Sequence, residues 1–267
     1  MQDQGYFGKN SITWKVARES ILNLGGARAV LMQLAHPLVA MGVSEHSSYL
    51  RDPLRRTMST FMLGQMLTFG STQTARRAAH AINSLHRGVR GSLPFSAGAY
   101  RKGTPYSASD PRLLLWVHAT LVDTILLMYP LFIGPLSPEE QDRYYQESKR
   151  VAALLGLDAA DMPATVNELR RYVDVMVHSD QLAATPQARQ LARVVLFPPV
   201  PAILRPLLLL QLQLTIALLP QRVREIYGLE WGSVRQTLFH LTATGMRTVL
   251  PRLPASMRIL PVTQKLM

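Results

Sequence analysis

The residues of this chain that could bind a metal are mainly its histidines. The 267-residue sequence contains no cysteine, which excludes disulfides, thiolate metal sites, iron–sulfur clusters and cysteine nucleophiles. A metal would therefore be held by histidine, carboxylate or another oxygen ligand. Five of the seven histidines come before residue 120. The seven are His36, His46, His80, His86, His118, His178 and His240.

His86 lies at the edge of an amphipathic helix that we expect over residues 72–90. The apolar side of this helix is formed by Ala75, Ala78, Ala79, Ile82, Leu85 and Val89. His86 follows Ile82 by four residues, and Arg90 follows His86 by one further turn. An imidazole on an apolar helix face suits the axial ligand of a buried haem, and an arginine beside it suits a propionate. The alternative is a hydrogen-bonded core histidine.

A second pair of candidates lies on the preceding helix, expected over residues 53–69. Arg56 and Thr60 are four residues apart, so they share one face of that helix. A guanidinium and a hydroxyl placed together could orient a diatomic ligand or stabilise developing negative charge. The alternative is a solvated basic pair beside a capped helix start.

Three further histidines are secondary candidates for cofactor contact. His118 lies in a helix that is apolar on nearly all sides, so its imidazole must find a partner: a ligand, a second polar group or a core hydrogen bond. His36 precedes Pro37, which indicates a break between two helices. His36 and His46 either line a pocket at that break or close the backbone hydrogen bonds that it leaves open.

Other site chemistries are poorly supported by the sequence. It contains no HExxH pair, no P-loop, no nucleotide-binding glycine fingerprint and no Gly-x-Ser-x-Gly. It also lacks the two Glu-x-x-His motifs of a di-iron carboxylate bundle. A non-haem iron site is therefore not expected.

The elements that must position these residues are helices. Apolar spacing is helical almost throughout, and alternating runs of β-branched residues are missing, so we expect an all-α fold and a single domain over residues 1–267. The other expected helices cover residues 13–24, 27–35, 37–45, 111–128, 138–155, 164–178, 186–196, 202–218, 221–227 and 234–250. Four helices begin with a capping residue before proline: Asp52, Asp110, Ser137 and Thr185. Residues 91–109 form the longest stretch without helical pattern, which indicates a functional loop.

The net charge of +12 is unevenly distributed. Residues 1–110 carry 13 basic and 5 acidic groups, residues 111–184 carry 6 and 10, and residues 185–267 carry 10 and 2. The basic residues are scattered without aromatic platforms, so nucleic-acid binding is not expected. No secretory signal is visible, which favours a cytoplasmic location. Residues 200–220 are apolar but interrupted by Pro206, Gln211 and Gln213, which favours a buried helix and leaves a segment lying on a membrane as the alternative.

Four segments taken together resemble a family of bacterial and fungal oxygenases. They are GGARAVLMQLAHPLVAMGVSEHS, DPLRRTMSTF, SLHRGVRG and YSASDPRLLLWVHATLVDT, and RPLLLL and REIYGLEW fit later helices of the family. The family includes the rubber oxygenase called latex-clearing protein and a side-chain-cleaving oxygenase of the mycophenolic acid pathway. The resemblance extends over about residues 25–227.

This resemblance implies a haem b held between helices and cleavage of a carbon–carbon double bond with dioxygen. It makes His86 the iron ligand, places Arg56 and Thr60 on the opposite side of the haem, and leaves Arg90 near a propionate. The rubber enzymes have a lysine before the threonine, where this chain has Ser59, so a lysine that closes the iron site is not implied here. Glu45 is the nearest candidate for the distal base. The rubber enzymes are secreted, whereas no export signal is visible in this sequence, so an extracellular polymer is not the expected substrate.

We therefore predict a haem b-dependent oxygenase acting on an apolar small molecule with dioxygen. Its rivals are a non-catalytic haem-binding or sensing protein, a basic helical protein on a membrane surface without a cofactor, and an iron-free partner-binding domain. The colour of the purified protein separates the haem hypotheses from the others.

Overall fold

The structure is a computed structural model that describes residues 3–266, and it is all-α apart from one small hairpin. Its α-helices are α1 (Ile12–Ala17), α2 (Gly26–Leu34), α3 (Pro37–His46), α4 (Pro53–Phe69), α5 (Thr72–Gly88), α6 (Pro111–Phe132), α7 (Pro138–Leu154), α8 (Val166–His178), α9 (Pro186–Leu196), α10 (Arg205–Leu218), α11 (Gln221–Tyr227), α12 (Ser233–Val249), α13 (Ala255–Arg258) and α14 (Pro261–Leu266). Short 3₁₀ segments are η1 (Ser20–Gly25), η2 (Ser48–Leu50), η3 (Ala159–Asp161), η4 (Ala202–Leu204) and η5 (Leu250–Arg252). The all-α prediction is confirmed.

The capping residues predicted from the sequence act as expected. The side chains of Asp52, Asp110, Ser137 and Thr185 each accept a backbone N–H in the first turn of α4, α6, α7 and α9. At Ser137 the cap is reciprocal, because the Glu140 carboxylate also accepts the Ser137 N–H at 3.0 Å. The local sequence therefore determines where these four helices begin.

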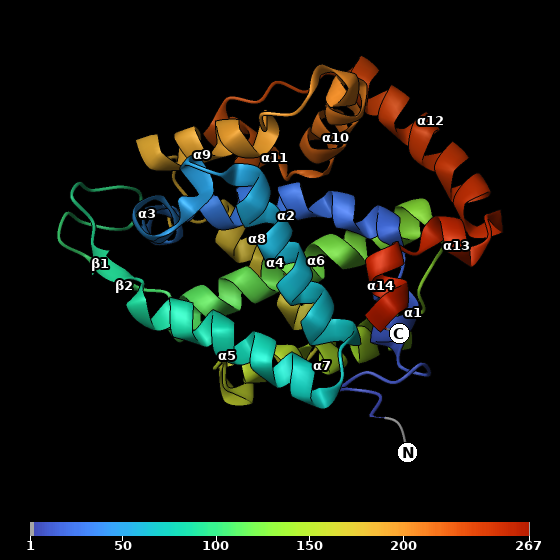
Figure 1. Cartoon of the computed structure of the whole chain (residues 1–267). Helices are drawn as coiled ribbons and strands as arrows, with labels where there is room; N and C mark the ends of the chain where they lie inside the picture. Colours follow the sequence, from blue (N-terminus) through green and yellow to red (C-terminus); the bar gives the residue numbers. More distant parts are fainter. Residues whose placement is uncertain (1–2, 267) are drawn as a thin grey trace.

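Helix α6 passes through the middle of the molecule, and the other helices pack around it (Figure 1). Trp116 is fully buried on α6 and donates its indole N–H to the Met32 carbonyl of α2 at 3.2 Å. Arg28 of α2, with a side chain 4% exposed, pairs with Asp123 of α6 at 2.7 Å and donates to the Leu218 carbonyl of α10 at 2.7 Å. A buried charge needs such partners, so this contact fixes α2, α6 and α10 together.

Among the described residues, α6 alone is long and apolar enough to cross a membrane by length and composition. Within its most apolar window, 56% of residues are buried inside the fold. This is weak evidence for membrane association. The apolar segment at residues 200–220 contains the shorter helix Ala202–Leu218 and falls below that length.

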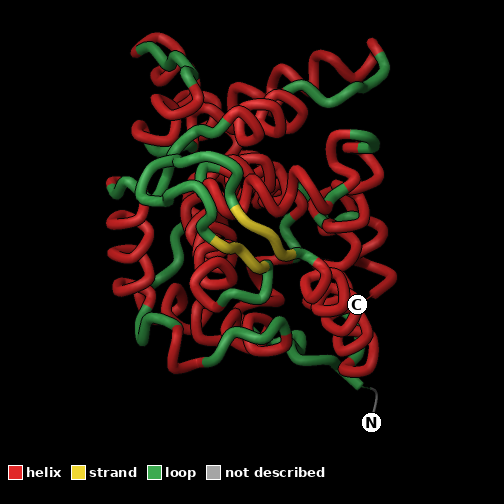
Figure 2. The backbone as a smooth tube through the Cα atoms, turned by 90° about the vertical axis from the view of Figure 1, so that its left-hand side faces the viewer, coloured by secondary structure: helices red, strands yellow, loops and turns green. Residues whose placement is uncertain are grey.

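The sequence prediction differs from the structure at several places. The helix expected over residues 13–24 is divided between α1 and η1, because the chain turns at Glu19 to bury its carboxylate against Arg258 at 2.7 Å. The loop at residues 91–109 contributes to a hairpin of β1 (Arg90–Ser92) and β2 (Pro105–Ser107), which no strand pattern predicted (Figure 2). Helices α13 and α14 were also missed.

Candidate functional site

Helices α4 and α5 form consecutive arms joined by a short turn, and they carry the main site candidates (Figure 1). Near the turn they pack through a cluster that contains Leu63 and Leu67 of α4 and Ala78, Ala79 and Ile82 of α5. The cluster also contains Val151 and Leu154 at the end of α7, so it identifies the inward sides of α4 and α5.

The same two faces lead to the site residues. Counting back from Leu67 and Leu63 by helical turns reaches Thr60 and then Arg56. Counting forward from Ile82 by four residues reaches His86. Arg56 and Thr60 therefore continue the inward side of α4, His86 continues that of α5, and Arg56 lies near enough to His86 for its charge to act on the imidazole. At this far end of the pair, Arg56 and His86 are half-buried and Thr60 is exposed.

Arg56 and Thr60 contact each other directly. The Arg56 Nη1 donates to the Thr60 Oγ1, and that hydroxyl donates to the Arg56 carbonyl at 3.0 Å. The Arg56 Nε donates to Ser47 Oγ at 3.2 Å, which connects the pair to the end of α3. The guanidinium is thus held by groups on both sides of the α3–α4 connection.

The His86 imidazole is half-buried, and within residues 3–266 it has no hydrogen-bond partner. Desolvation, and secondly the charge of Arg56, lowers the pKa of His86 below its usual 6.5. Both effects favour the neutral ring, which is the form that coordinates iron. A porphyrin supplies four nitrogen ligands itself, so one imidazole from the chain is enough for a haem. The described residues contain no group of three side chains able to hold a bare metal ion.

The predicted helical relation between His86 and Arg90 is wrong. Helix α5 ends at Gly88, Val89 is extended with φ −91° and ψ 95°, and Arg90 pairs with Ser107 in the hairpin. The exposed guanidinium of Arg90 donates to the Arg87 carbonyl at 2.8 Å. The chain leaves the helix here because Val89 packs with the small cluster between α3 and the hairpin.

His36 uses both ring nitrogens within the fold. Its Nδ1 accepts the Leu38 N–H at 3.3 Å as the cap of α3, and its Nε2 lies 2.9 Å from Tyr100 Oη. The Tyr100 hydroxyl donates to Gln181 Oε1 at 3.1 Å, so the Nε2 proton is donated to Tyr100. This arrangement favours the sequence alternative in which His36 closes backbone hydrogen bonds.

His118 also has a protein partner, since its Nε2 lies 3.2 Å from Ser148 Oγ of α7. Desolvation, with a smaller contribution from Lys149, lowers the pKa of His118 to about 4. Its imidazole is therefore neutral and tied to α7, and it lies outside the inward sides of α4 and α5.

A third group of side chains is hydrogen-bonded at the end of α3, and the sequence predicted only part of it. Tyr106 of β2 is buried and donates its hydroxyl to the Glu45 carboxylate, and His46 Nε2 lies 3.3 Å from the same Tyr106 oxygen. Desolvation, then the hydrogen bond and charge of Glu45, raise the pKa of Tyr106. The sequence singled out Glu45 and His46 but not Tyr106, because the hairpin that carries Tyr106 to α3 has no local signal.

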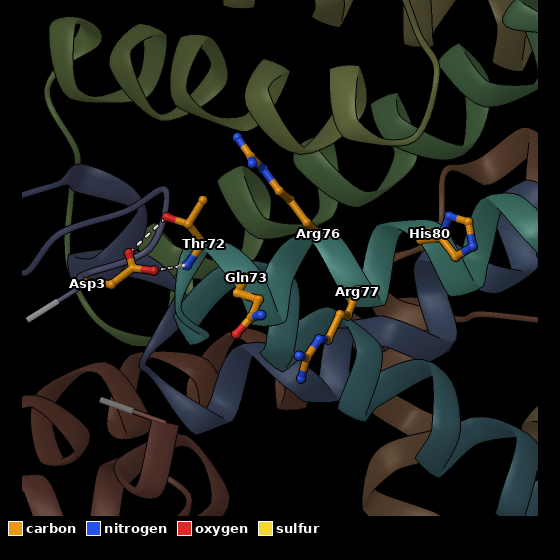
Figure 3. Close-up of a pocket in the computed structure, with 6 residues that line it drawn as sticks. All are labelled: Asp3, Thr72, Gln73, Arg76, Arg77 and His80. Atoms are coloured by element: carbon orange, nitrogen blue, oxygen red, sulfur yellow. Dashed lines mark hydrogen bonds between the residues drawn. The ribbon is translucent and has the colours of Figure 1, made fainter.

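Two surface recesses lie away from this site. One is at the opposite end of α5 and is lined by Asp3, Thr72, Gln73, Arg76, Arg77 and His80 (Figure 3). There Asp3 accepts from the Thr72 backbone at 2.9 Å and from its hydroxyl at 2.8 Å. The carboxylate thus occupies the start of the helix. The other recess lies between α7 and α8.

Comparison with known proteins places the chain in a family. Residues 14–248 match the family described as "ER-bound oxygenase mpaB/B'/Rubber oxygenase, catalytic domain". The chain belongs to this family. The match confirms the resemblance drawn from the sequence and extends it at both ends. The family's description is that of an oxygenase catalytic domain, so we interpret the candidate site as part of an oxygenase domain.

Two curated proteins that are similar to the chain carry names that state no function. The chain is 28% identical over 230 residues to "Uncharacterized protein Mb2261" of Mycobacterium bovis and to "Uncharacterized protein Rv2237" of Mycobacterium tuberculosis. Each alignment covers 83% of this chain and 86% of the relative. No solved structure shows a significant match.

Proposed function

We propose that this protein is a haem b-dependent oxygenase that cleaves a carbon–carbon double bond of an apolar substrate with dioxygen. One observation carries the proposal. The inward sides of α4 and α5 are apolar and packed near their turn, and they lead to the neutral His86 imidazole, which has no hydrogen-bond partner among residues 3–266 and feels the charge of the Thr60-bonded Arg56. Membership of an oxygenase family supports this interpretation.

His86 is the proposed proximal ligand of the haem. When bound, the haem supplies the redox-active iron for dioxygen chemistry. The half-buried position of His86 and the nearby charge of Arg56 favour the unprotonated imidazole at neutral pH, so no proton has to be removed before His86 coordinates. The role of Arg90 toward a propionate stays a prediction, now from the hairpin and not from α5.

Arg56 and Thr60 are proposed to orient the reactants opposite His86. Their donors are held in one place by bonds to each other and to Ser47, so little reorganisation is needed when negative charge develops nearby. Thr60 is exposed in the structure, and a ligand that binds its hydroxyl would replace one of the two bonds to Arg56.

Glu45 is the proposed proton acceptor of the site. The Glu45 carboxylate accepts the Tyr106 hydroxyl, and His46 Nε2 lies 3.3 Å from the same Tyr106 oxygen, so the three side chains form one hydrogen-bonded network. Ser47, which accepts a hydrogen bond from Arg56, is two residues from Glu45 along the chain, and this proximity in sequence supports the assignment. The overall reaction balances without another reductant, because an alkene and one dioxygen give two carbonyl products.

Reconstitution with hemin tests the cofactor. The purified chain should develop a Soret band with one equivalent of hemin, and His86→Ala should weaken or abolish it. His80→Ala is the matched control, because His80 is an exposed histidine of the same helix and should leave the band unchanged. A colourless wild type, or an unchanged spectrum in His86→Ala, contradicts the proposal.

Oxygen consumption separates an oxygenase from a haem sensor. The reconstituted protein should consume dioxygen with a panel of apolar alkenes and yield carbonyl products detectable by mass spectrometry. Arg56→Met should retain the Soret band and lose turnover. A haem spectrum without turnover on any alkene in the panel would support the non-catalytic alternative.

A further inference from the structure

Helix α12 exposes an apolar stripe that the fold does not use. Val234, Leu238, Leu241 and Val249 lie at helical spacing along one side and are between 55% and 72% exposed. Single exposed apolar residues are ordinary, but three within two turns, with Val249 on the same side two turns further on, form a patch. The stripe therefore needs a partner outside the described fold.

The side of α12 that packs on the protein is a different one. Phe239, Ala243, Met246 and Leu250 are buried or half-buried and contact the main hydrophobic cluster around α6. These residues are also spaced by helical turns, so α12 carries two separate apolar sides. Only the inner side is needed to hold the helix in place.

The start of α10, a helix that packs against α12, also exposes apolar side chains. Ile203 of η4 and Leu207 of α10 are 85% and 58% exposed, and α10 packs directly against α12 at the upper right of Figure 1. We call the combined surface the apolar edge; it consists of Ile203, Leu207, Val234, Leu238, Leu241 and Val249. It belongs to two neighbouring helices and not to a single protruding loop.

Charge indicates what covers the apolar edge. Residues 185–267 carry 10 basic and 2 acidic groups, and exposed arginines adjoin the edge at Arg205, Arg235 and Arg252. Glu225 and Glu230, between α10 and α12, are the two acids. A second copy of the chain would bring like charge to like charge, whereas an anionic bilayer offers apolar volume beneath a layer of opposite charge.

We propose that the apolar edge docks the protein onto an anionic lipid bilayer. The leucine and valine side chains of α10 and α12 enter the interface, and the adjoining arginines contact phosphate headgroups. This is attachment by one face, and it does not depend on haem binding. An apolar substrate dissolved in the bilayer would then be concentrated at the same surface.

The test is sedimentation of the full chain with vesicles, with no hemin added. Vesicles of phosphatidylcholine mixed with phosphatidylglycerol should bind the protein, phosphatidylcholine alone should bind it more weakly, and salt should reduce binding. Leu238→Gln/Leu241→Gln should weaken binding at least about tenfold through lost apolar burial. Arg205→Gln/Arg235→Gln should weaken it by a similar order, and only toward the anionic vesicles.

The matched control is Arg171→Gln/Val175→Gln on α8, which removes one exposed arginine and one exposed aliphatic residue elsewhere. It should bind as the wild type does, and all variants should keep the wild-type melting temperature because the altered side chains are exposed. Failure of the wild type to bind anionic vesicles overturns the proposal. So does a dimer in light scattering that Leu238→Gln/Leu241→Gln dissociates, because a second copy would then cover the edge.

Discussion

Lowering the pH should destabilise the protein through His36. This imidazole is 3% exposed and is fully hydrogen-bonded in its neutral form, as acceptor from the Leu38 N–H and as donor to Tyr100. Burial lowers the pKa of His36 from 6.5 to about 4; the charge of Asp110 opposes this effect and that of Arg112 adds to it. A protonated His36 could no longer accept the Leu38 N–H.

The size of the effect follows from the two pKa values. Above pH 6.5 the ring is neutral in both the folded and the unfolded chain, so its contribution to stability is fully present. Below pH 6.5 only the unfolded chain takes up the proton, and stability falls by about 1.4 kcal/mol per pH unit until about pH 4. At pH 5 the expected loss from this one residue is about 2 kcal/mol, a substantial part of a typical unfolding free energy of roughly 5–15 kcal/mol.

Urea denaturation at pH 7 and pH 5 measures this loss. His36→Asn removes the titrating group and keeps a side-chain oxygen that can cap α3, so the variant should lose about 2 kcal/mol less than the wild type between the two pH values. His80→Asn, at an exposed histidine, should behave as the wild type does. An identical pH dependence in wild type and His36→Asn would refute the argument, whatever the absolute stability of the variant.

Three other substitutions test contacts of the site and the core. Gly91→Ala would place a Cβ 2.6 Å from the Tyr106 hydroxyl oxygen, so the Tyr106 ring would have to move. We expect the free energy of unfolding, measured by urea denaturation, to fall by about 1–3 kcal/mol. Unchanged stability would show that the ring moves freely. Arg56→Gln should raise the pKa of His86 in an NMR titration of the haem-free protein, and a lowered or equal pKa would contradict the assigned proximity. Asp123→Ala leaves the buried Arg28 without its counter-ion. Because the Asp123 side chain is 21% exposed, we expect the free energy of unfolding to fall by about 2–4 kcal/mol and the Tm by roughly 5 °C. A Tm within about 1 °C of the wild type would mean that solvent balances the charge of Arg28.

The sequence predicts those parts of the candidate site that depend only on spacing within one helix. The four-residue spacing of Arg56 and Thr60 is enough to place them on one face, and the structure joins them by a hydrogen bond. The same reasoning failed for Arg90, because it assumed that α5 continues past Gly88. A helix end that is set by packing against another segment leaves little trace in the local pattern.

The partners of the buried polar groups required the tertiary structure. His36 is satisfied by Tyr100, and Glu45 by Tyr106, across more than sixty residues of sequence in each case. No helical or strand periodicity relates such residues, since each local pattern describes only neighbours along one element. The sequence left His36 open between two roles for this reason.

By itself, the sequence determined the helical class, most helix starts and the side of each helix that turns inward, because apolar spacing and capping are local properties of the chain. Only the tertiary structure decided which inward sides meet. It brought Arg56 of α4 near His86 of α5, engaged both ring nitrogens of His36 in hydrogen bonds, and left one apolar side of α12 exposed. Packing between distant segments makes these choices, because a buried polar or apolar group must find a complementary neighbour wherever the fold brings one.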